Sequence, residues 1–281
     1  MPELPEVETV CRVMRHALEG KRITEVETVH DPIFFGNHSP HAIDAALRGR
    51  IVRGVGRRGK FFWLLLGGEG PTVFGHLGMS GWIREIGKEG TRLQGHGKAP
   101  LDDANGRPRF LRLLIRTAGG RGVVLTDPRR LGRIWLSPSV EEDRRVARLG
   151  PDALDALPPA KELLALFARR KVSIKAVLLD QSALSGIGNW VADEVLYQSR
   201  IAPKRVAASL TAAEVGRLRR AIHNVLTRAV DDASDHTKFP KSWLFAHRWG
   251  GARGSALIGK HAIVREEIAG RTTAWVPEVQ R

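Results

Sequence analysis

The feature that most constrains the fold is a change in the spacing of apolar residues near residue 150. Between residues 50 and 137 they form short runs separated by Gly, Pro and Arg, such as Phe61–Leu66 and Val123–Thr126. Runs of this length at this spacing are typical of a β-sandwich or barrel. After a proline-containing stretch at 151–159, apolar residues recur at helical spacing, as in the segment 218–226. We therefore predict two domains, one built of strands and one of helices.

An amphipathic helix is predicted ahead of the strands, over residues 5–19. Pro5 and Glu6 suit its first turn, and Gly20 suits its end. The predicted class is therefore α+β, with an N-terminal β-sandwich that follows a leading helix, and a helical C-terminal domain that ends in a β-hairpin. The polar, glycine-rich stretch 88–109 is expected to be a loop. The predicted boundaries are an N-terminal domain at 1–150, a linker at 151–160, a helical domain at 161–237 and a hairpin at 238–281.

The charge of the chain restricts its partners. The 281 residues carry a formal net charge of +15, which favours a polyanion such as nucleic acid or an anionic membrane surface. The single cysteine, Cys11, excludes an internal disulfide and a cysteine-rich zinc site, so we expect no metal and no cofactor. No stretch approaches the roughly 20 apolar residues of a membrane helix. The acidic, proline-rich N-terminus is unlike a signal peptide, and we expect a cytoplasmic, nucleoid-associated protein.

The first residues carry a candidate nucleophile. If Met1 is removed, Pro2 presents a secondary amine, and a chain-terminal amine is neutral near pH 7 far more readily than a lysine. A neutral amine can attack a sugar aldehyde carbon and form an iminium, and the neighbouring Glu3 can move protons. Prolines and acids also begin ordinary helices, and from these residues alone that structural role is the more common one.

Three later segments carry residues suited to a nucleic-acid interface. Lys60, directly before a predicted strand, can hold a phosphate as a point charge. Glycines around Met79 allow an exposed turn whose apolar tip can wedge into a base stack. In a loop bounded by Pro128 and Gly132, Arg129 can read a base edge or fill a gap, with Leu131 as an apolar wedge. Each segment also fits a charged turn or core packing.

Two segments of the second half can bind phosphate. In the segment SGIGNW, Asn189 lies at the start of a predicted helix, where free backbone N–H groups bind anions. Lys171 and Lys175, upstream, can add positive charge. Near the end of the chain, Arg271 lies at a predicted hairpin turn and can reach a phosphate. A helix–turn–helix corner and an ordinary hairpin explain the same residues without a ligand.

The order of these segments resembles the formamidopyrimidine-DNA glycosylase/endonuclease VIII family. The matching motifs are PELPEVET at the start, then RRGK, HLGMSG, DPRRLG, SGIGNW and GRTTAWVPEVQ, and they span nearly the whole chain. HLGMSG is more similar to the formamidopyrimidine branch. The resemblance implies a bifunctional glycosylase and abasic-site lyase that acts on damaged double-stranded DNA in base excision repair.

The resemblance also implies roles for individual residues. Pro2 is the nucleophile that forms the Schiff base, Glu3 is the acid–base residue, Glu6 supports that site, and Lys60 contacts phosphate at the lesion. Met79, Arg129 and Leu131 fill the gap left by the flipped nucleotide, because a base inside a duplex cannot be reached. His76 is also predicted to bind DNA. The implied phosphate contacts come from Lys171 and Asn189 of a helix-two-turn-helix module, and from Arg271 of the finger hairpin.

Three departures from the family pattern affect these expectations. The four zinc-binding cysteines of a typical finger are absent, so we expect a zinc-less hairpin that packs through Trp243, Trp249 and Trp275. The usual wedge phenylalanine is Leu131. Only a short polar stretch, 231–238, joins the last helix to the hairpin, so the loop that caps 8-oxoguanine is truncated. We therefore predict weak removal of 8-oxoguanine and better activity on formamidopyrimidines and hydantoins.

Alternatives remain at this stage. An endonuclease VIII-like glycosylase would favour oxidised pyrimidines, and a non-catalytic binder of damaged DNA would keep the helical module without the chemistry. The intact Pro2–Glu3 pair argues against the binder. An RNA-binding protein is disfavoured, because nine Phe and one Tyr supply little for an aromatic stacking platform. We expect a monomer, since flipping one nucleotide needs no two-fold symmetry.

Overall fold

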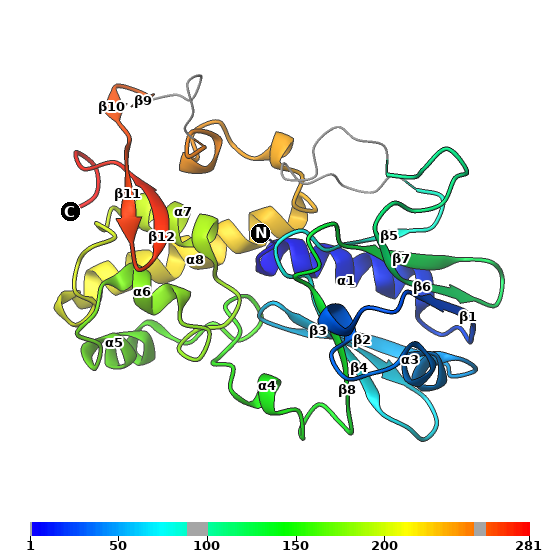
Figure 1. Cartoon of the computed structure of the whole chain (residues 1–281). Coiled ribbons are helices and arrows are strands. Elements are labelled where there is room, and N and C mark those ends of the chain that lie inside the picture. The colour runs from blue at the N-terminus through cyan, green and yellow to red at the C-terminus, as the bar shows by residue number, and fades with distance from the viewer. Residues whose placement is uncertain (1, 89–100, 250–256) are drawn as a thin grey trace. The chain divides into compact units, whose positions relative to one another are not determined.

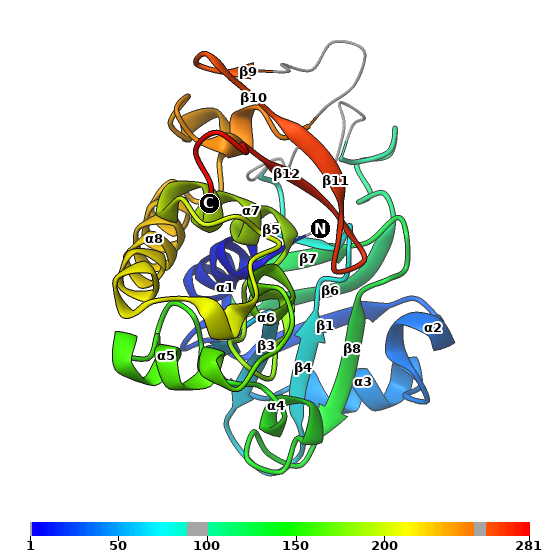
Figure 2. The same ribbon diagram turned by 90° about the vertical axis from the view of Figure 1, so that its left-hand side faces the viewer.

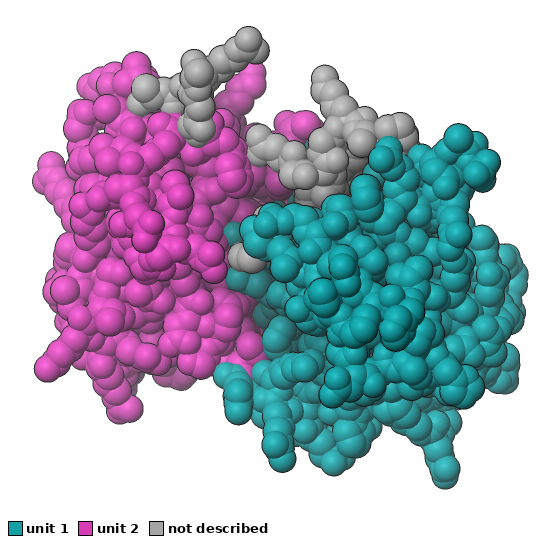
Figure 3. All heavy atoms as spheres, in the orientation of Figure 1, with its two compact units in different colours: residues 1–148, 233–235 teal, residues 149–232, 236–281 magenta. Residues whose placement is uncertain are grey.

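The computed structural model describes residues 2–88, 101–249 and 257–281, and the chain divides into two compact units (Figure 3). Unit 1 comprises Met1–Arg148 and Ala233–Asp235, and unit 2 comprises Leu149–Asp232 and His236–Arg281. Residues 89–100 of the expected loop at 88–109 lie outside the described residues. Its described part, 88 and 101–109, contains no helix or strand beyond an isolated bridge between Asp102 and Pro108. Residues Ala233–Asp235, which follow the last long helix, thus belong to unit 1.

Unit 1 is an antiparallel sandwich of two four-stranded sheets behind a leading helix, α1 (Leu4–Leu18) (Figure 1). The first sheet contains, in order, β1 (Ile23–Thr28), β6 (Leu111–Thr117), β7 (Gly122–Thr126) and β5 (Trp82–Glu85). The second contains β2 (Val52–Arg58), β3 (Phe61–Leu66), β4 (Thr72–His76) and β8 (Arg133–Ser137). Three short helices complete the unit: α2 (Pro32–Phe35), α3 (Pro40–Leu47) and α4 (Arg144–Ala147).

One apolar core joins the two sheets and the helix. Leu64 and Val73 from one sheet, Ile115 and Leu125 from the other, and Met14 of α1 belong to the same buried cluster. Leu113 and Ile115 of β6 belong to this cluster, whereas Leu111 and Leu114 belong to a second buried cluster with Val124, so both faces of this strand are covered. Burial of this shared cluster is the main force that holds the sandwich together.

The leading helix is fixed to the second sheet by charge as well as by packing. The Glu8 carboxylate accepts a hydrogen bond from Arg57 Nε of β2 at 3.0 Å, and Arg15 Nε donates to the Val55 carbonyl at 3.1 Å. Residue numbers rise along α1 as they fall along β2, so the helix runs antiparallel to that strand. Its first turn therefore points toward the turn between β2 and β3.

Unit 2 begins with four principal helices, α5 (Ala160–Ala168), α6 (Ile174–Leu179), α7 (Asn189–Ser199) and α8 (Ala212–Asp231). A capping box begins α8, because Thr211 Oγ1 accepts from the Glu214 N–H while the Glu214 carboxylate accepts from the Thr211 N–H. Three single turns of 3-10 helix lie at Ala207–Ser209, His236–Lys238 and Leu244–Ala246. In the part of the chain that the structure describes, no helix is both long and apolar enough to span a membrane.

The end of unit 2 is built of short strands. β9 (Leu257–Ile258) pairs with β10 (His261–Ala262), and β11 (Val264–Ile268) pairs with β12 (Arg271–Trp275), the hairpin that Figure 2 shows in orange and red. The two residues between β11 and β12, Ala269 and Gly270, have φ of +54° and +68°. Positive φ at both central residues is typical of the type I′ turn, whose twist matches that of the strands.

The expected tryptophan packing of this region is correct only in part. Trp243 is buried and Trp275 is half-buried, with its indole N–H donating to Glu266 at 2.7 Å. The expectation that Trp249 packs the hairpin is wrong, because half of its surface is exposed; its ring meets the edge of Phe245 and lies beneath the Arg248 guanidinium. The small apolar cluster beneath the hairpin instead contains Leu244, Ile258, Ile263, Ala274 and Val276.

Candidate active site and nucleic-acid interface

Strand register brings three of the sequence segments to one end of the second sheet. His76, the last residue of β4, pairs with Phe61 at the start of β3 and with Arg133 at the start of β8. Lys60 directly precedes β3, the Met79 turn directly follows β4, and the Arg129 loop directly precedes β8. Antiparallel register therefore gathers all three at the same edge of the sandwich.

The Met79 turn and the Arg129 loop pack directly against one another. A Cβ atom added to Gly78, where φ is +61°, would lie 2.3 Å from the carbonyl carbon of Leu131. Only a glycine permits so close an approach of the two backbones at this φ. A hydrogen bond of 2.5 Å from Ser80 Oγ to Asp127 Oδ1 joins the same segments. The two segments therefore form one double loop, residues 77–81 with 127–132.

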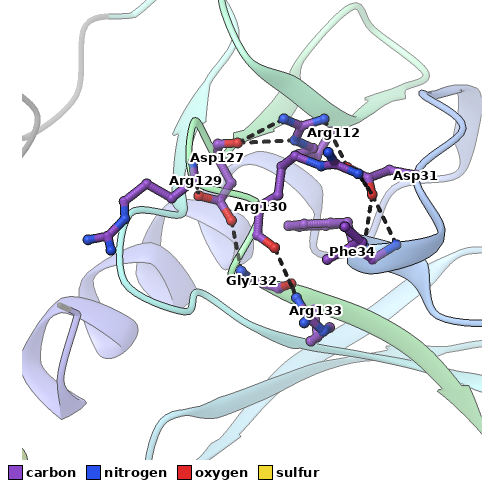
Figure 4. Close-up of polar contacts among 9 residues, drawn as sticks. Asp31, Phe34, Arg112, Asp127, Arg129, Arg130, Gly132 and Arg133 are labelled. Carbon is purple, nitrogen blue, oxygen red and sulfur yellow. Dashed lines mark hydrogen bonds and ion pairs between the residues drawn. The ribbon is translucent and has the colours of Figure 1, made fainter.

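Two buried aspartates bind the Arg129 half of this double loop (Figure 4). Asp127 is fully buried and accepts from the Arg129 N–H at 3.2 Å and the Gly132 N–H at 2.7 Å. Asp31 caps α2 and binds Arg130 at 2.8 and 2.9 Å. Arg112 connects the two aspartates, because it donates to the Asp127 carbonyl and to the Asp31 carboxylate. The Arg130 guanidinium holds the pKa of Asp31 below its ordinary value.

The tips of the double loop are exposed, as a binding surface requires. Met79 is 43% exposed and Leu131 is 39% exposed, although both are apolar. The Arg129 side chain is exposed and extends away from the aspartate cluster in Figure 4. Of the two arginines that the sequence places in this loop, Arg130 is bound by Asp31 and Arg129 is presented to solvent. Two exposed apolar side chains beside an exposed arginine are the kind of groups that can insert between stacked bases.

His76 is held as a neutral imidazole. Burial lowers its pKa to about 4, and the charges of Lys60 and Arg133 lower it further in the same direction. Its Nδ1 accepts a hydrogen bond from the Gly78 N–H at 3.1 Å. With Nδ1 as the acceptor, the ring proton is assigned to Nε2, which can donate to an anionic oxygen. Lys60 lies beside His76 because Phe61, the next residue along the chain, pairs with His76.

The N-terminal residues form a buried acid site at the start of α1. Pro2, Glu3 and Glu6 are all buried, and Glu3 is the N-cap residue of the helix. The Glu6 carboxylate accepts from the Glu3 N–H at 2.9 Å, which completes a capping box. Glu6 thereby fixes the backbone of Glu3. Because α1 runs antiparallel to β2, this site points toward the end of the sheet that carries Lys60.

The neighbouring carboxylate and thiol of α1 have structural roles. Glu8 binds Arg15 at 2.8 Å and Arg57 at 3.0 Å, and these cations hold its pKa below the ordinary value against the effect of burial. Burial raises the pKa of Cys11 to about 12, so its thiol is protonated at neutral pH. Neither Glu8 nor Cys11 is therefore a candidate reactive group, whereas Pro2 and Glu3 remain candidates.

Unit 2 brings two of its predicted phosphate-binding residues together. Asn189 is the first residue of α7, after the buried N-cap Gly188, and its Nδ2 donates to the Thr272 carbonyl at 2.9 Å. Thr272 adjoins Arg271, which is exposed at the start of β12. Lys171 is exposed ahead of α6. The expectation that Lys175 adds surface charge is wrong, because it is fully buried and bound to Asp193 at 2.6 Å.

The residues that sequence reasoning missed are those that support the loops. Asp31 lies about 100 positions before Arg130, and only the folded sheet brings them together. Asp127 carried a local signal, since an aspartate followed by Pro and a turn is typical of side-chain caps on backbone N–H groups. Asp193 and Arg248 carried none, because a buried pair 55 positions apart has no pattern in the sequence.

Comparison with known proteins agrees with this arrangement. A family model of the formamidopyrimidine-DNA glycosylase N-terminal domain matches residues 1–134, and a model of that family's H2TH domain matches residues 149–240. A formamidopyrimidine-DNA glycosylase of Arabidopsis thaliana is 34% identical over 282 residues, which cover 100% of this chain and 71% of that protein. One of Nitrobacter winogradskyi is 35% identical over 305 residues, which cover 100% of both.

The fold is also shared with a solved structure. The Lactococcus lactis formamidopyrimidine-DNA glycosylase bound to DNA with an abasic site superposes with a TM-score of 0.76 over 100% of both chains, at 23% identity. Fold and sequence together define a two-domain protein of the DNA glycosylase class. The chain belongs to the formamidopyrimidine-DNA glycosylase family, and the predicted α+β fold class is confirmed.

Proposed function

We propose that this chain is a base-excision-repair DNA glycosylase and abasic-site lyase that uses the Pro2 amine as its nucleophile. The observation that supports the proposal most directly is the placement of the Pro2–Glu3 site, Lys60, His76 and the double loop toward one end of the sandwich. An amine, a buried acid, phosphate-binding donors and an apolar wedge are the groups that base removal from a duplex requires.

In the proposed reaction, the Pro2 nitrogen attacks C1′ while the bond from C1′ to the damaged base breaks. The base leaves with the electron pair and takes up a proton. Glu3 donates a proton to O4′ as the sugar ring opens, and the amine loses its own proton, which leaves an iminium between Pro2 and C1′. Loss of a C2′ proton then expels the 3′ phosphate, and a second elimination expels the 5′ phosphate. Glu6 holds Glu3 in place through the Glu3 N–H.

The double loop is proposed to fill the space of the flipped nucleotide. Met79 and Leu131 provide the exposed apolar surface, and Arg129 faces the orphaned base. Unstacking costs a few kcal/mol, which wedge contacts and phosphate contacts must offset. Lys60 and His76 Nε2 are proposed to donate to phosphates beside the lesion. Lys171, Asn189 and Arg271 are proposed to donate to phosphates along unit 2.

The preferred lesions are proposed to be formamidopyrimidines and hydantoins, with 8-oxoguanine removed weakly. The stretch after α8 is short, and part of it is committed to unit 1. Ser234 is fully buried, and its hydroxyl lies 3.1 Å from Thr9 Oγ1 of α1. A segment anchored in this way has little free length with which to cover a flipped base.

The oligomeric state and the location in the cell are also proposed. We expect the protein to act as a monomer on damaged double-stranded DNA, in a cytoplasmic, nucleoid-associated location. The net charge of +15 suits a salt-sensitive grip on the phosphate backbone.

Single-turnover excision from four duplexes tests the proposal. The duplexes carry one formamidopyrimidine, one guanidinohydantoin, one 8-oxoguanine or one thymine glycol. We expect the first two to be excised at least tenfold faster than 8-oxoguanine. Thymine glycol as the fastest substrate would instead support an endonuclease VIII-like enzyme, and binding of all four duplexes without excision would support a non-catalytic binder.

A further inference from the structure

The hairpin of unit 2 is held by a buried ionic network centred on Asp193 of α7. Its Oδ1 accepts from Lys175 Nζ at 2.6 Å, and its Oδ2 accepts from Arg248 Nη2 at 2.6 Å and from the Ala274 N–H at 3.1 Å. Lys175 Nζ also donates to Thr273 Oγ1 at 2.5 Å. Lys175 and the Asp193 carboxylate are fully buried, and Arg248 is 8% exposed. One carboxylate thus joins α6, α7, the segment before the hairpin and β12.

The hairpin requires such an anchor. Two paired strands of five residues are marginal in water without further packing. The outer edge of β12 has no third strand among the described residues. Its apolar packing is limited to the small cluster that includes Leu244, Ala274 and Val276. Something other than its own pairing must therefore fix the position of the hairpin on the helices.

Two side chains of α7 take the place of a third strand along β12. Asn189 Nδ2 donates to the Thr272 carbonyl at 2.9 Å, and Asp193 accepts from the Ala274 N–H at 3.1 Å. Residues 189 and 193 are one helical turn apart and lie on the same face. Residues 272 and 274 are two apart on a strand, so their backbone groups point to the same edge. The rise of about 6 Å between helical positions i and i+4 is close to the roughly 6.7 Å between strand positions i and i+2.

Both ends of this contact carry residues of the proposed DNA interface. Asn189 begins α7, and Arg271 begins β12 directly before Thr272. An amide nitrogen has two N–H groups, so Asn189 can bind Thr272 and an anion together. The position of Arg271 relative to the N-terminus of α7 therefore depends on the network around Asp193.

We infer that Asp193, with Arg248, is the positioning element that aligns Arg271 with the N-terminus of α7, so that both bind the DNA backbone as one unit. Neither residue touches DNA in this account. They act through Arg271, and this inference rests on the proposed function. The same network explains how a hairpin without cysteines is fixed without a metal ion.

Arg248→Met is the decisive variant. It removes the side-chain bond from Asp193 to the segment before the hairpin, while the bonds of Arg265 to the His247 and Arg248 carbonyls remain. It leaves Lys175 and Asp193 as a neutral buried pair, whereas Asp193→Asn would leave two buried cations unbalanced. Lys260→Met is the matched control, because it removes one exposed charge from the turn between β9 and β10 with no bond to Asp193. The full chain is titrated with a duplex that contains a tetrahydrofuran abasic-site analogue, at several salt concentrations.

We expect Arg248→Met to weaken binding at least tenfold. The slope of log affinity against log salt concentration should fall by about one, and we expect the same two changes from Arg271→Ala. The double variant should bind no more weakly than Arg271→Ala alone, because Arg248 acts through Arg271. Lys260→Met should change the affinity less than twofold. Unchanged affinity in Arg248→Met, or effects that add in the double variant, would overturn the inference.

Amide hydrogen exchange without DNA separates this inference from the proposed function. Arg248→Met should exchange at residues 271–275 at least tenfold faster than the wild type, with exchange in α8 unchanged. If the wild type fails to act on damaged DNA but this acceleration is seen, the anchor stands and the proposed function falls. If the wild type excises lesions and neither exchange nor affinity changes in the variant, the inference falls and the proposed function stands.

Discussion

Two buried aspartates hold the candidate DNA-binding loops of this protein, and they do so in different ways. Asp127 of unit 1 binds two backbone N–H groups within five positions of itself and one serine hydroxyl. Asp193 of unit 2 binds two cations and one N–H group that lie 18, 55 and 81 positions away. The backbone bonds of Asp127 are local turn chemistry and only its serine bond reaches across the sheet, whereas the whole arrangement around Asp193 exists only when unit 2 is folded.

The two regions also differ in how water reaches their ion pairs. The Arg130–Asp31 pair of unit 1 has a guanidinium side chain that is 45% exposed, whereas both partners of the Lys175–Asp193 pair are 0% exposed. Exposed pairs are screened by salt and contribute little to stability. A buried pair contributes through the cost of leaving either partner alone. The two regions should therefore respond oppositely to several perturbations.

The largest expected effect is that of Lys175→Met. Removal of the ammonium leaves Asp193 with one cation and leaves Thr273 Oγ1 without its donor. Loss of one partner of a buried ion pair typically costs about 3–5 kcal/mol. We expect the free energy of unfolding of unit 2 to fall by about that amount, with unit 1 unchanged. Calorimetry combined with hydrogen exchange in α7 measures this change in the stability of unit 2.

Lys161→Met is the control for that variant, because Lys161 is exposed on α5. It should change the stability by no more than about 0.5 kcal/mol. If Lys175→Met proves as mild as the control, the buried network is not what holds unit 2 together.

The second-largest expected effect is a pH dependence of the free energy of unfolding, which should differ between the two units. Burial raises the pKa of Glu194, beside Asp193, to about 7. A carboxyl whose pKa is higher in the folded state destabilises the fold as it ionises. Unit 2 should therefore lose about 3 kcal/mol of stability as the pH rises from 4.5 to 7. Denaturant titrations of the wild type and Glu194→Gln over that range measure the difference.

Glu194→Gln should remove this dependence, while Glu162→Gln on the exposed face of α5 should keep it. A wild-type chain whose unit 2 gains stability over the same range, relative to Glu194→Gln, would contradict the assignment.

Unit 1 should show the opposite slope because of His76. Burial lowers its pKa to about 4, so the unfolded chain binds the proton more tightly than the folded one. Stability is complete above pH 6.5 and should decline by about 3 kcal/mol as the pH falls to 4. Denaturation of His76→Asn, which keeps an acceptor for the Gly78 N–H, should lack this decline. The exposed His41→Asn is the control, and an identical decline in both variants would exclude His76 as its source.

The contact between the two halves of the double loop should be broken by Gly78→Ala. The new Cβ meets the Leu131 backbone at 2.3 Å and the residue keeps a φ of +61°, so both packing and backbone are strained. We expect the free energy of unfolding of unit 1 to fall by about 2 kcal/mol, and the rate of lesion excision to fall at least tenfold. Gly49→Ala has a positive φ with nothing near its Cβ, so it shows the backbone contribution alone. Equal excision by both variants would show that the double loop does not need its close contact.

The smallest effect is expected from Arg130→Ala. Asp31 keeps its bond to Arg112 and its cap on α2, so little is lost. The melting temperature should fall slightly at low salt and match the wild type in 1 M salt, because screening removes the contribution of the exposed pair. A large, salt-independent fall would show that this surface pair stabilises the loop as a buried pair does.

The sequence predicted the elements whose burial follows a period and missed those that depend on distant partners. β3 is predicted residue for residue and α1 within one residue at each end, because their apolar spacing is regular. β1 was missed, since only Ile23 of its six residues is buried. β5 was missed as well, because it has only four residues and includes Arg84, a buried cation that pairs with Asp102.

The same division holds for the candidate site. Met79, Arg129 and Leu131 lie in loops that Gly and Pro mark in the sequence, and the structure exposes them. Their assembly depends on the pairing of His76 with both Phe61 and Arg133, which no local pattern specifies. Lys175 was assigned to the surface because lysines are seldom buried, and only a carboxylate 18 positions away accounts for its burial.

Borohydride trapping on a duplex with one abasic site tests the central claim most directly. The purified protein is mixed with the duplex, reduced, digested and mapped by mass spectrometry. We expect one covalent adduct on the nitrogen of Pro2, in molecules from which Met1 has been removed. An adduct on a lysine, or tight binding without any adduct by protein that lacks Met1, would contradict the proline mechanism.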